Sequence, residues 1–105
     1  MYKLCFFVPK SHLASVKDAL FEQGAGQLGG YEHCAWQVLG QGQFRPLAGS
    51  NPFLGEVGNN HAVDEYRVEM AITDERIKDV LSCLKRVHPY QQPAYEYWQI
   101  NPSLD

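Results

Sequence analysis

The chain lacks the features that mark several specialised classes of small protein. Its three cysteines, Cys5, Cys34 and Cys83, are an odd number without CxxC spacing, which indicates neither a disulfide framework nor a zinc ribbon. Nine lysines and arginines against twelve acids leave no basic surplus for nucleic acid. No apolar run approaches the roughly 18 to 20 residues of a membrane span. The apolar N-terminus is only a strand long, so no signal peptide is expected. We therefore expect a cytoplasmic protein that binds neither nucleic acid nor a membrane.

What remains is an ordinary globular composition. The chain has 105 residues, of which 45% are hydrophobic and 20% charged. This length suits one domain with a core that needs no disulfide or metal to hold it. We therefore treat residues 1–105 as a single domain.

The first part of the chain predicts a strand followed by a helix. Aromatic and branched residues dominate Tyr2–Val8, and Pro9 is expected to end the strand's pairing. Apolar residues then recur at helical spacing, which predicts a helix over about residues 12–23. Ser11 is its expected N-cap, and Gly24 stands where a left-handed C-terminal cap is wanted.

The middle predicts a second strand and a long loop. Tyr31–Leu39 has the composition of a strand, and Gln41–Pro46 either continues it or folds back as a hairpin arm after Gly40. Residues 47–60 are dense in glycine, proline and asparagine, which is typical of a loop.

The last part predicts a strand, a helix and a strand. In Val63–Thr73, Tyr66, Val68, Met70 and Ile72 alternate with charged residues, so one face of this strand is expected to be buried. A helix capped by Thr73 or Asp74 follows and is expected to end at His88-Pro89. Ala94–Ile100 is the last predicted strand, and the tail 101–105 is expected to fray.

The order strand, helix, strand, strand, helix, strand predicts an α+β fold. It is the βαββαβ pattern of a ferredoxin-like sandwich, in which a four-stranded antiparallel sheet carries two helices on one face. Strands one and three should be central, and Leu4–Val8 and Val68–Ile72 are the most aliphatic strand segments. Strand one is apolar on both faces, so a partner subunit is expected to cover the face without helices. We predict a homo-oligomer.

The glycine-rich middle and the turn near residue 90 are the expected ligand-binding regions. Glycines there allow positive φ and close approach of the backbone to a ligand. Gly24–Gly29 matches the letters GxGxxG, but it follows a helix where a dinucleotide fingerprint follows a strand, so a helix cap and a turn are favoured. The candidate ligand-binding residues are Gly24, Gly26, Gly29, Tyr31, Gly40, Gly42, Phe44, Asn51 and Tyr90.

Candidate metal ligands are His33 and His88, with a divalent metal ion as the candidate cofactor. Neither histidine has ligand spacing, and a solvated or hydrogen-bonded histidine is the default interpretation. Two prolines make the segment from His88 to Tyr95 rigid, which either presents His88 and Tyr90 to a ligand or locks the last strand. No nucleophile stands in a catalytic motif, and Glu65, Arg67 and Glu69 are best interpreted as a salt network.

Several segments together resemble one family. These are Gly24-Ala25-Gly26 with Tyr31, His33-Cys34, Gly40-Gln41-Gly42 with Phe44 and Pro46, Asn51-Pro52-Phe53, Val63-Asp64-Glu65, and His88-Pro89-Tyr90 with Ala94-Tyr95. They resemble the middle, inserted domain of the NIF-three-like proteins, a domain similar in fold to the CutA and PII proteins. The resemblance implies a standalone version of that domain and association as in CutA and PII, with a trimer as the first expectation and a dimer as the second.

The metal ligands and hydrolase activity ascribed to that family belong to flanking halves and have no counterpart positions in this sequence. Gln91 and Gln92 also stand where the resembling family segment has two glutamates, and amides are poorer cation ligands than carboxylates. The first functional hypothesis is therefore a non-enzymatic, oligomeric binding or regulatory module for a small ligand, metal ion or protein. The alternative is a small metal-dependent hydrolase with His33, Cys34 and His88 at one site.

Overall fold

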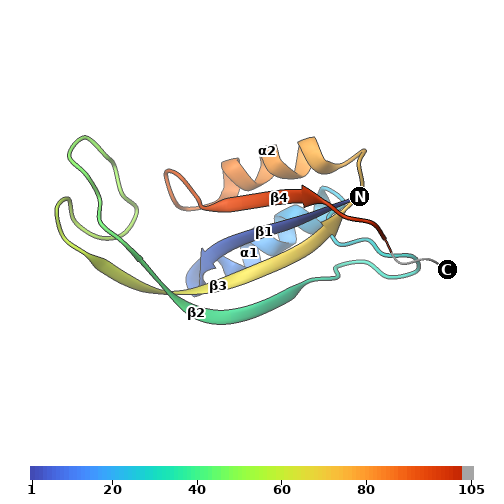
Figure 1. Cartoon of the computed structure of the whole chain (residues 1–105), viewed down its shortest axis with the longest axis horizontal. Helices are drawn as coiled ribbons and strands as arrows, with labels where there is room; N and C mark the ends of the chain where they lie inside the picture. Colours follow the sequence, from blue (N-terminus) through green and yellow to red (C-terminus); the bar gives the residue numbers. More distant parts are fainter. Residues whose placement is uncertain (103–105) are drawn as a thin grey trace.

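A single antiparallel sheet with two helices on one face forms the protein (Figure 1). The computed structural model describes residues 1–102, so the end of the predicted tail, 103–105, lies outside the described residues. The elements are β1 (Tyr2–Pro9), α1 (Lys10–Glu22), β2 (Trp36–Phe44), β3 (His61–Ile72), α2 (Ile77–Val87) and β4 (Tyr95–Gln99). The strand order is β2-β3-β1-β4, which confirms the ferredoxin-like prediction and the central position of β1 and β3.

The core lies between the sheet and the helices. Alternate residues of the two central strands are buried there, as the period of two in their sequences requires. They meet apolar stripes of both helices, in which residues three and four apart share a face. The main members are Leu4, Phe6, Val8, Val68, Met70, Ile72, Val16, Leu20, Val80 and Leu84.

The two ends of α1 differ from each other in how they are capped. The predicted cap at Ser11 is wrong, because the helix starts at Lys10 directly after the strand, with Pro9 as N-cap and no side-chain cap bond. At the other end, Gly24 has φ of 97° and its N–H bonds the carbonyl of Phe21, while Ala25 N–H bonds that of Leu20. This pair of bonds is a Schellman motif, which confirms the helix cap predicted at Gly24.

Strand β2 starts later and ends later than the strand predicted over Tyr31–Leu39. Residues 31–35 are irregular because His33 has φ of 60° and Cys34 N–H bonds the Gly26 carbonyl, so the strand starts at Trp36 instead of Tyr31. It continues without a break to Phe44, paired with His61, which settles the open alternative after Gly40.

The β2–β3 ribbon extends beyond the rest of the sheet. The last pair between β1 and β3 joins Pro9 to Glu65, whereas β2 and β3 stay paired as far as Phe44 and His61. Figure 1 shows the ribbon and its long loop projecting at the end of the molecule opposite both termini. This projection forms one wall of the site described below.

Helix α2 also starts later than predicted. Thr73 to Arg76 form a turn in which Arg76 N–H bonds the Thr73 carbonyl, and α2 has no side-chain cap. Asp74, one of the two predicted caps, instead pairs with the N-terminal amine of Met1. Among the described residues, neither helix is long and apolar enough to cross a membrane.

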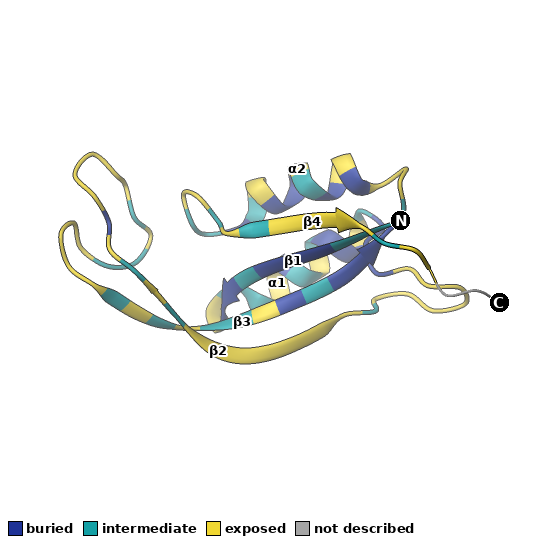
Figure 2. Cartoon of the chain, viewed as in Figure 1, coloured by how far each residue is buried: buried dark blue, intermediate teal, exposed yellow. Residues whose placement is uncertain are grey.

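The sheet face opposite the helices, here called the open face, has no covering layer within the described residues. The paired residues on it include Trp36, Val38, Arg67 and Phe7 in neighbouring strands, and Trp98 on β4. Trp36 is 56% exposed and Trp98 41%. Figure 2 shows the edge strands β2 and β4 exposed along most of their length, on either side of the more buried β1 and β3. The open face therefore carries apolar surface of the kind the sequence predicts for strand one.

Candidate functional site

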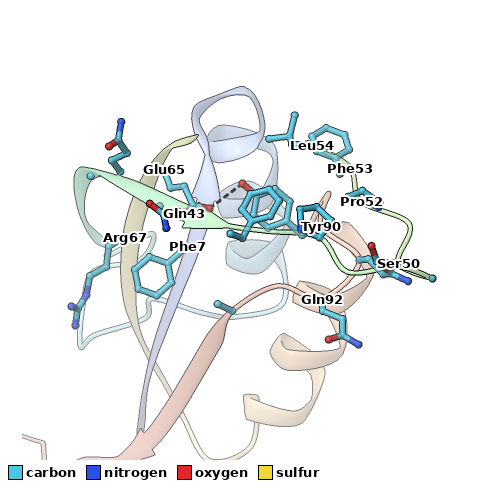
Figure 3. Close-up of a pocket in the computed structure, with 18 of the residues that line it drawn as sticks. Phe7, Gln43, Ser50, Pro52, Phe53, Leu54, Glu65, Arg67, Tyr90 and Gln92 are labelled. Atoms are coloured by element: carbon cyan, nitrogen blue, oxygen red, sulfur yellow. Dashed lines mark hydrogen bonds between the residues drawn. The ribbon is translucent and has the colours of Figure 1, made fainter. Parts of the chain in front are cut away.

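A cavity of about 990 Å³ lies at the end of the open face where the β2–β3 ribbon projects. Its floor is the sheet, at Phe7, Val38, Gly40 and Gly42, and its far wall is the loop that carries Pro52, Phe53 and Leu54. Figure 3 shows Tyr90 between these two sides. A concave, largely apolar site of this size with a few polar groups is typical of small-molecule binding.

A hydrogen bond between Tyr90 and Glu65 crosses the cavity. The Tyr90 hydroxyl donates to Glu65 Oε2 over 2.9 Å and joins the α2–β4 turn to strand β3. Burial raises the pKa of the Tyr90 phenol, and the bond to the Glu65 carboxylate raises it further. The phenol therefore stays protonated at neutral pH and acts as a donor, not as a base.

Gly42 provides the space that the Glu65 side chain occupies. A Cβ atom at position 42 would lie 1.9 Å from Glu65 Oε1, which no real contact allows. The carboxylate thus lies directly over the β2 backbone. Gly40, two residues away on the same face, has only the Glu65 carbonyl oxygen near the position of a Cβ, at 4.0 Å. Gly40 therefore leaves open floor beside this carboxylate, to which a ligand can approach closely.

His88 fixes the turn that carries Tyr90. Its Nε2 bonds the Phe7 carbonyl over 2.6 Å, and the Tyr90 backbone N–H donates to its Nδ1 over 3.1 Å. An accepting Nδ1 leaves the proton on Nε2, so the ring is neutral and both nitrogens are engaged. His88 is only 6% exposed, and this burial lowers its pKa. The last residue pair between β1 and β4 is Phe6 with Tyr95. The His88 imidazole bonds the next residue of β1, Phe7, and so holds the turn that precedes β4 against β1.

Two loops are tied together beside the cavity. The Asn51 N–H donates to Gln91 Oε1 over 3.1 Å, which links the long loop to the α2–β4 turn. The ring of Tyr90 also lies 6.2 Å from that of Phe44 and 6.3 Å from that of Phe53. The cavity is therefore formed by ordered contacts between segments far apart in sequence.

The structure brings together about half of the predicted ligand-binding residues. Gly40, Gly42, Phe44 and Tyr90 line the cavity. Asn51 contributes the backbone bond to Gln91 that holds the loop. These five residues come from β2, the long loop and the α2–β4 turn, so they are adjacent only in the folded chain.

The other four predicted ligand-binding residues, Gly24, Gly26, Gly29 and Tyr31, do not line this cavity. Gly24 caps α1, and Gly26 is held between Ala71 and Cys34 by backbone bonds. Gly29 and Tyr31 lie in an exposed turn closed by the bridge from Leu28 to Tyr31. The positive φ angles of Gly24 and Gly26 are therefore explained by the helix cap and by the backbone bonds to Ala71 and Cys34.

The structure does not bring the predicted metal residues together. His33 stacks on Phe21 with ring centroids 4.6 Å apart, and its neighbour Cys34 is anchored through Gly26 to Ala71, which pairs with Lys3. His88 bonds the Phe7 carbonyl, and Phe7 is four residues from Lys3 along β1. At ~3.3 Å per residue, the backbone positions of Lys3 and Phe7 are about 13 Å apart. No group of three His, Cys, Asp or Glu residues within residues 1–102 could hold a metal ion. The described residues therefore do not fit a metal site.

Several cavity residues were missed by sequence reasoning. Glu65 was assigned to a salt network, and the pair that forms is instead Arg67 with Glu69, at 3.3 Å. Phe7 was noted only as apolar surface on the second face of strand one. Phe53 belonged to the resemblance but was not assigned to the site. Phe7 carried a signal in its alternation, whereas the bond from Tyr90 to Glu65 depends on tertiary contact over 25 residues.

The fold defines the class of protein. Solved structures of similar fold include the periplasmic divalent cation tolerance protein CutA from Archaeoglobus fulgidus, with a TM-score of 0.69 and 17% identity over 99% of this chain and 88% of that one. At this identity the likeness shows the ferredoxin-like fold alone. No protein-family model matches the chain.

Closer relatives in sequence are longer proteins. The chain is 41% identical over 100 residues to a GTP cyclohydrolase 1 type 2 homolog of Mycobacterium leprae, and 40% identical over 101 residues to that of Bacillus subtilis. These matches cover 95% and 96% of this chain but only 26% and 27% of the relatives. A Bacillus cereus protein related to NIF3 has a TM-score of 0.81 and 32% identity over 96% of this chain and 26% of its own. The chain thus spans about a quarter of the length of these relatives and resembles one part of them.

Proposed function

We propose that this chain is a small-molecule binding module whose ligand occupies the cavity on the open face. The single observation that supports this most directly is the cavity itself, built from three separate segments and held by the Tyr90–Glu65 and Asn51–Gln91 bonds. We also propose that the chain corresponds to the inserted middle domain of NIF-three-like proteins. The alignment of nearly the whole chain with about a quarter of its relatives supports this.

The proposal is a binding role and not a reaction. The cavity pairs a carboxylate with a phenol that stays protonated, and neither is a nucleophile activated by a neighbouring base. The activity in the relatives' name refers to proteins about four times longer. The hydrolase alternative requires His33, Cys34 and His88 at one place, and the fold separates them.

We propose further that a second copy of this chain covers the open face, so that the ligand lies at a subunit boundary. Trp36 and Trp98 expose large apolar side chains on the part of the open face that continues from the cavity, level with Cys5 and Lys3 of β1. The edge strands β2 and β4 leave backbone groups available for pairing. Light scattering at micromolar concentration should give a mass above that of one chain. A Trp36→Lys variant should shift it towards the monomer, and a monomeric wild type would contradict this part.

Binding is tested with a pair of glycine variants. Gly40→Leu adds a side chain to the cavity floor without backbone strain, whereas Gly30→Leu adds the same side chain at a position with nothing within 4 Å and outside the cavity. Saturation-transfer NMR against a fragment library should find binders for the wild type. Their signals should be lost with Gly40→Leu and kept with Gly30→Leu. Equal signals for both variants, or no binder at all, would overturn the proposed function.

A further inference from the structure

The two charged residues that line the cavity do not form an ion pair with each other. Only Glu65 and Arg67 among its lining residues carry a formal charge. The Arg67 guanidinium pairs with Glu69 through Nε at 3.3 Å, and Figure 3 shows it directed away from Tyr90. Glu65 has only the neutral Tyr90 hydroxyl as a hydrogen-bond partner among the described side chains. Within residues 1–102, the Glu65 carboxylate in the cavity therefore forms no ion pair with a cationic side chain.

The free oxygen of this carboxylate is directed at the cavity floor. Tyr90 occupies Oε2, while Oε1 lies over Gly42, in the space that a Cβ at that position would take. A carboxylate oxygen accepts more than one hydrogen bond, and charged donors make the strongest ones. The site thus provides acceptors for a ligand that brings its own N–H donors and a positive charge.

The surroundings of Glu65 favour a flat ligand. Gly40 leaves the floor beside the Glu65 carboxylate without a side chain, and the aromatic rings of Phe7, Phe44 and Tyr90 stand around it. Aromatic faces attract both flat rings and cations. Four glutamines, Gln41, Gln43, Gln91 and Gln92, add uncharged polar groups to the lining. None of these features favours an anion.

We propose that the cavity binds a planar aromatic or heteroaromatic ligand that carries a cationic N–H edge, such as an amidinium or a protonated amino-heterocycle, and that Glu65 receives this edge. This inference rests on the proposed function, because it names the ligand class of the same cavity. Glu65 is the positioning carboxylate, Gly40 leaves the floor on which the ligand lies, and Tyr90 orients Glu65.

Three probes of one shape test the inference on the wild-type protein. Benzamidinium, benzamide and benzoate share a ring and differ in the charge of the group attached to it. Calorimetric titration should give benzamidinium a Kd at least tenfold lower than that of either other probe, because only it pairs with Glu65. In Glu65→Gln, where the Tyr90 hydroxyl keeps an oxygen acceptor, that preference should fall to less than threefold. Tyr90→Phe should keep the preference, since it frees Glu65 Oε2.

Other results would overturn the inference without touching the proposed function. Equal affinity for all three probes, preference for benzoate, no binding of benzamidinium at millimolar concentration, or a preference that survives in Glu65→Gln would each reject the ligand class. Loss of fragment binding in Gly40→Leu would still support the cavity as a binding site. A library without any binder would instead reject the proposed function itself.

Discussion

The two faces of the sheet differ in the residues they carry and in what those residues contact. On the helix-covered face, Leu4, Phe6 and Val8 are buried against aliphatic partners, and the face contributes only packing. On the open face, their immediate neighbours Cys5 and Phe7 lie among charged residues, tryptophans and a cavity. On the proposed function, adjacent residues of one strand therefore serve stability and ligand binding separately. The comparison shows that substitutions one position apart can test the two roles independently.

The largest expected effect comes from the pair Phe6 and Phe7. Phe6 is fully buried in the core, so Phe6→Ala should lower the free energy of unfolding by about 3–5 kcal/mol through lost burial and a cavity. Phe7 is only partly buried and lines the ligand cavity, so Phe7→Ala should cost less than half as much and weaken fragment binding. Urea unfolding measures both variants. Equal losses of stability would contradict the division between the faces.

A smaller effect is expected from pH, through His88. The folded state lowers the pKa of this imidazole below its usual 6.5, so the unfolded chain binds the proton more readily. The stability given by the neutral ring is complete above pH 6.5 and falls as the pH drops below it, by at most about 1.4 kcal/mol per pH unit. Urea unfolding between about pH 7.5 and 5.5 should show this extra slope in the wild type and not in His88→Gln. The other three histidines are common to both proteins, so the difference isolates His88. Parallel pH profiles would contradict the role given to its neutral ring.

The smallest effect is expected at Tyr90. Tyr90→Phe keeps the ring but removes the bond to Glu65, so it should lower the free energy of unfolding by about 1 kcal/mol. Tyr31→Phe is the matched control, because Tyr31 is 78% exposed and should change stability by no more than about 0.5 kcal/mol. Thermal and urea unfolding compare the two. An unchanged stability in Tyr90→Phe would mean that the bond across the cavity contributes nothing to its order.

The fold could be predicted from sequence because periodicity reports it directly. Alternation in Val68–Ile72 and the apolar stripe of α2 each identify the face turned to the core. Local rules were less reliable at the ends of elements. Ser11 had the chemistry of an N-cap, but the chain passes from β1 into α1 at Pro9 without a linker, so Ser11 lies inside the first turn of the helix. The start of β2 moved from Tyr31 to Trp36 because tertiary bonds hold Cys34 to Gly26.

The site could be predicted only in part. Composition identified glycine-rich segments but could not separate Gly24 and Gly26, which serve the backbone, from Gly40 and Gly42, which face the cavity. That distinction depends on which segments meet after folding. The joining of Glu65 to Tyr90 is a contact of this kind, and no local pattern of the sequence encodes it.

Amide chemical-shift mapping of the labelled protein with the strongest fragment binder tests the central claim most directly. If the open face carries the binding site, the largest shifts should fall on Gly40, Gly42 and Tyr90 and on the loop at Ser50–Leu54. The other glycine segment, Gly24–Tyr31, should not respond. Shifts gathered on Gly24–Tyr31, or spread over the surface without a maximum at the cavity, would contradict the account.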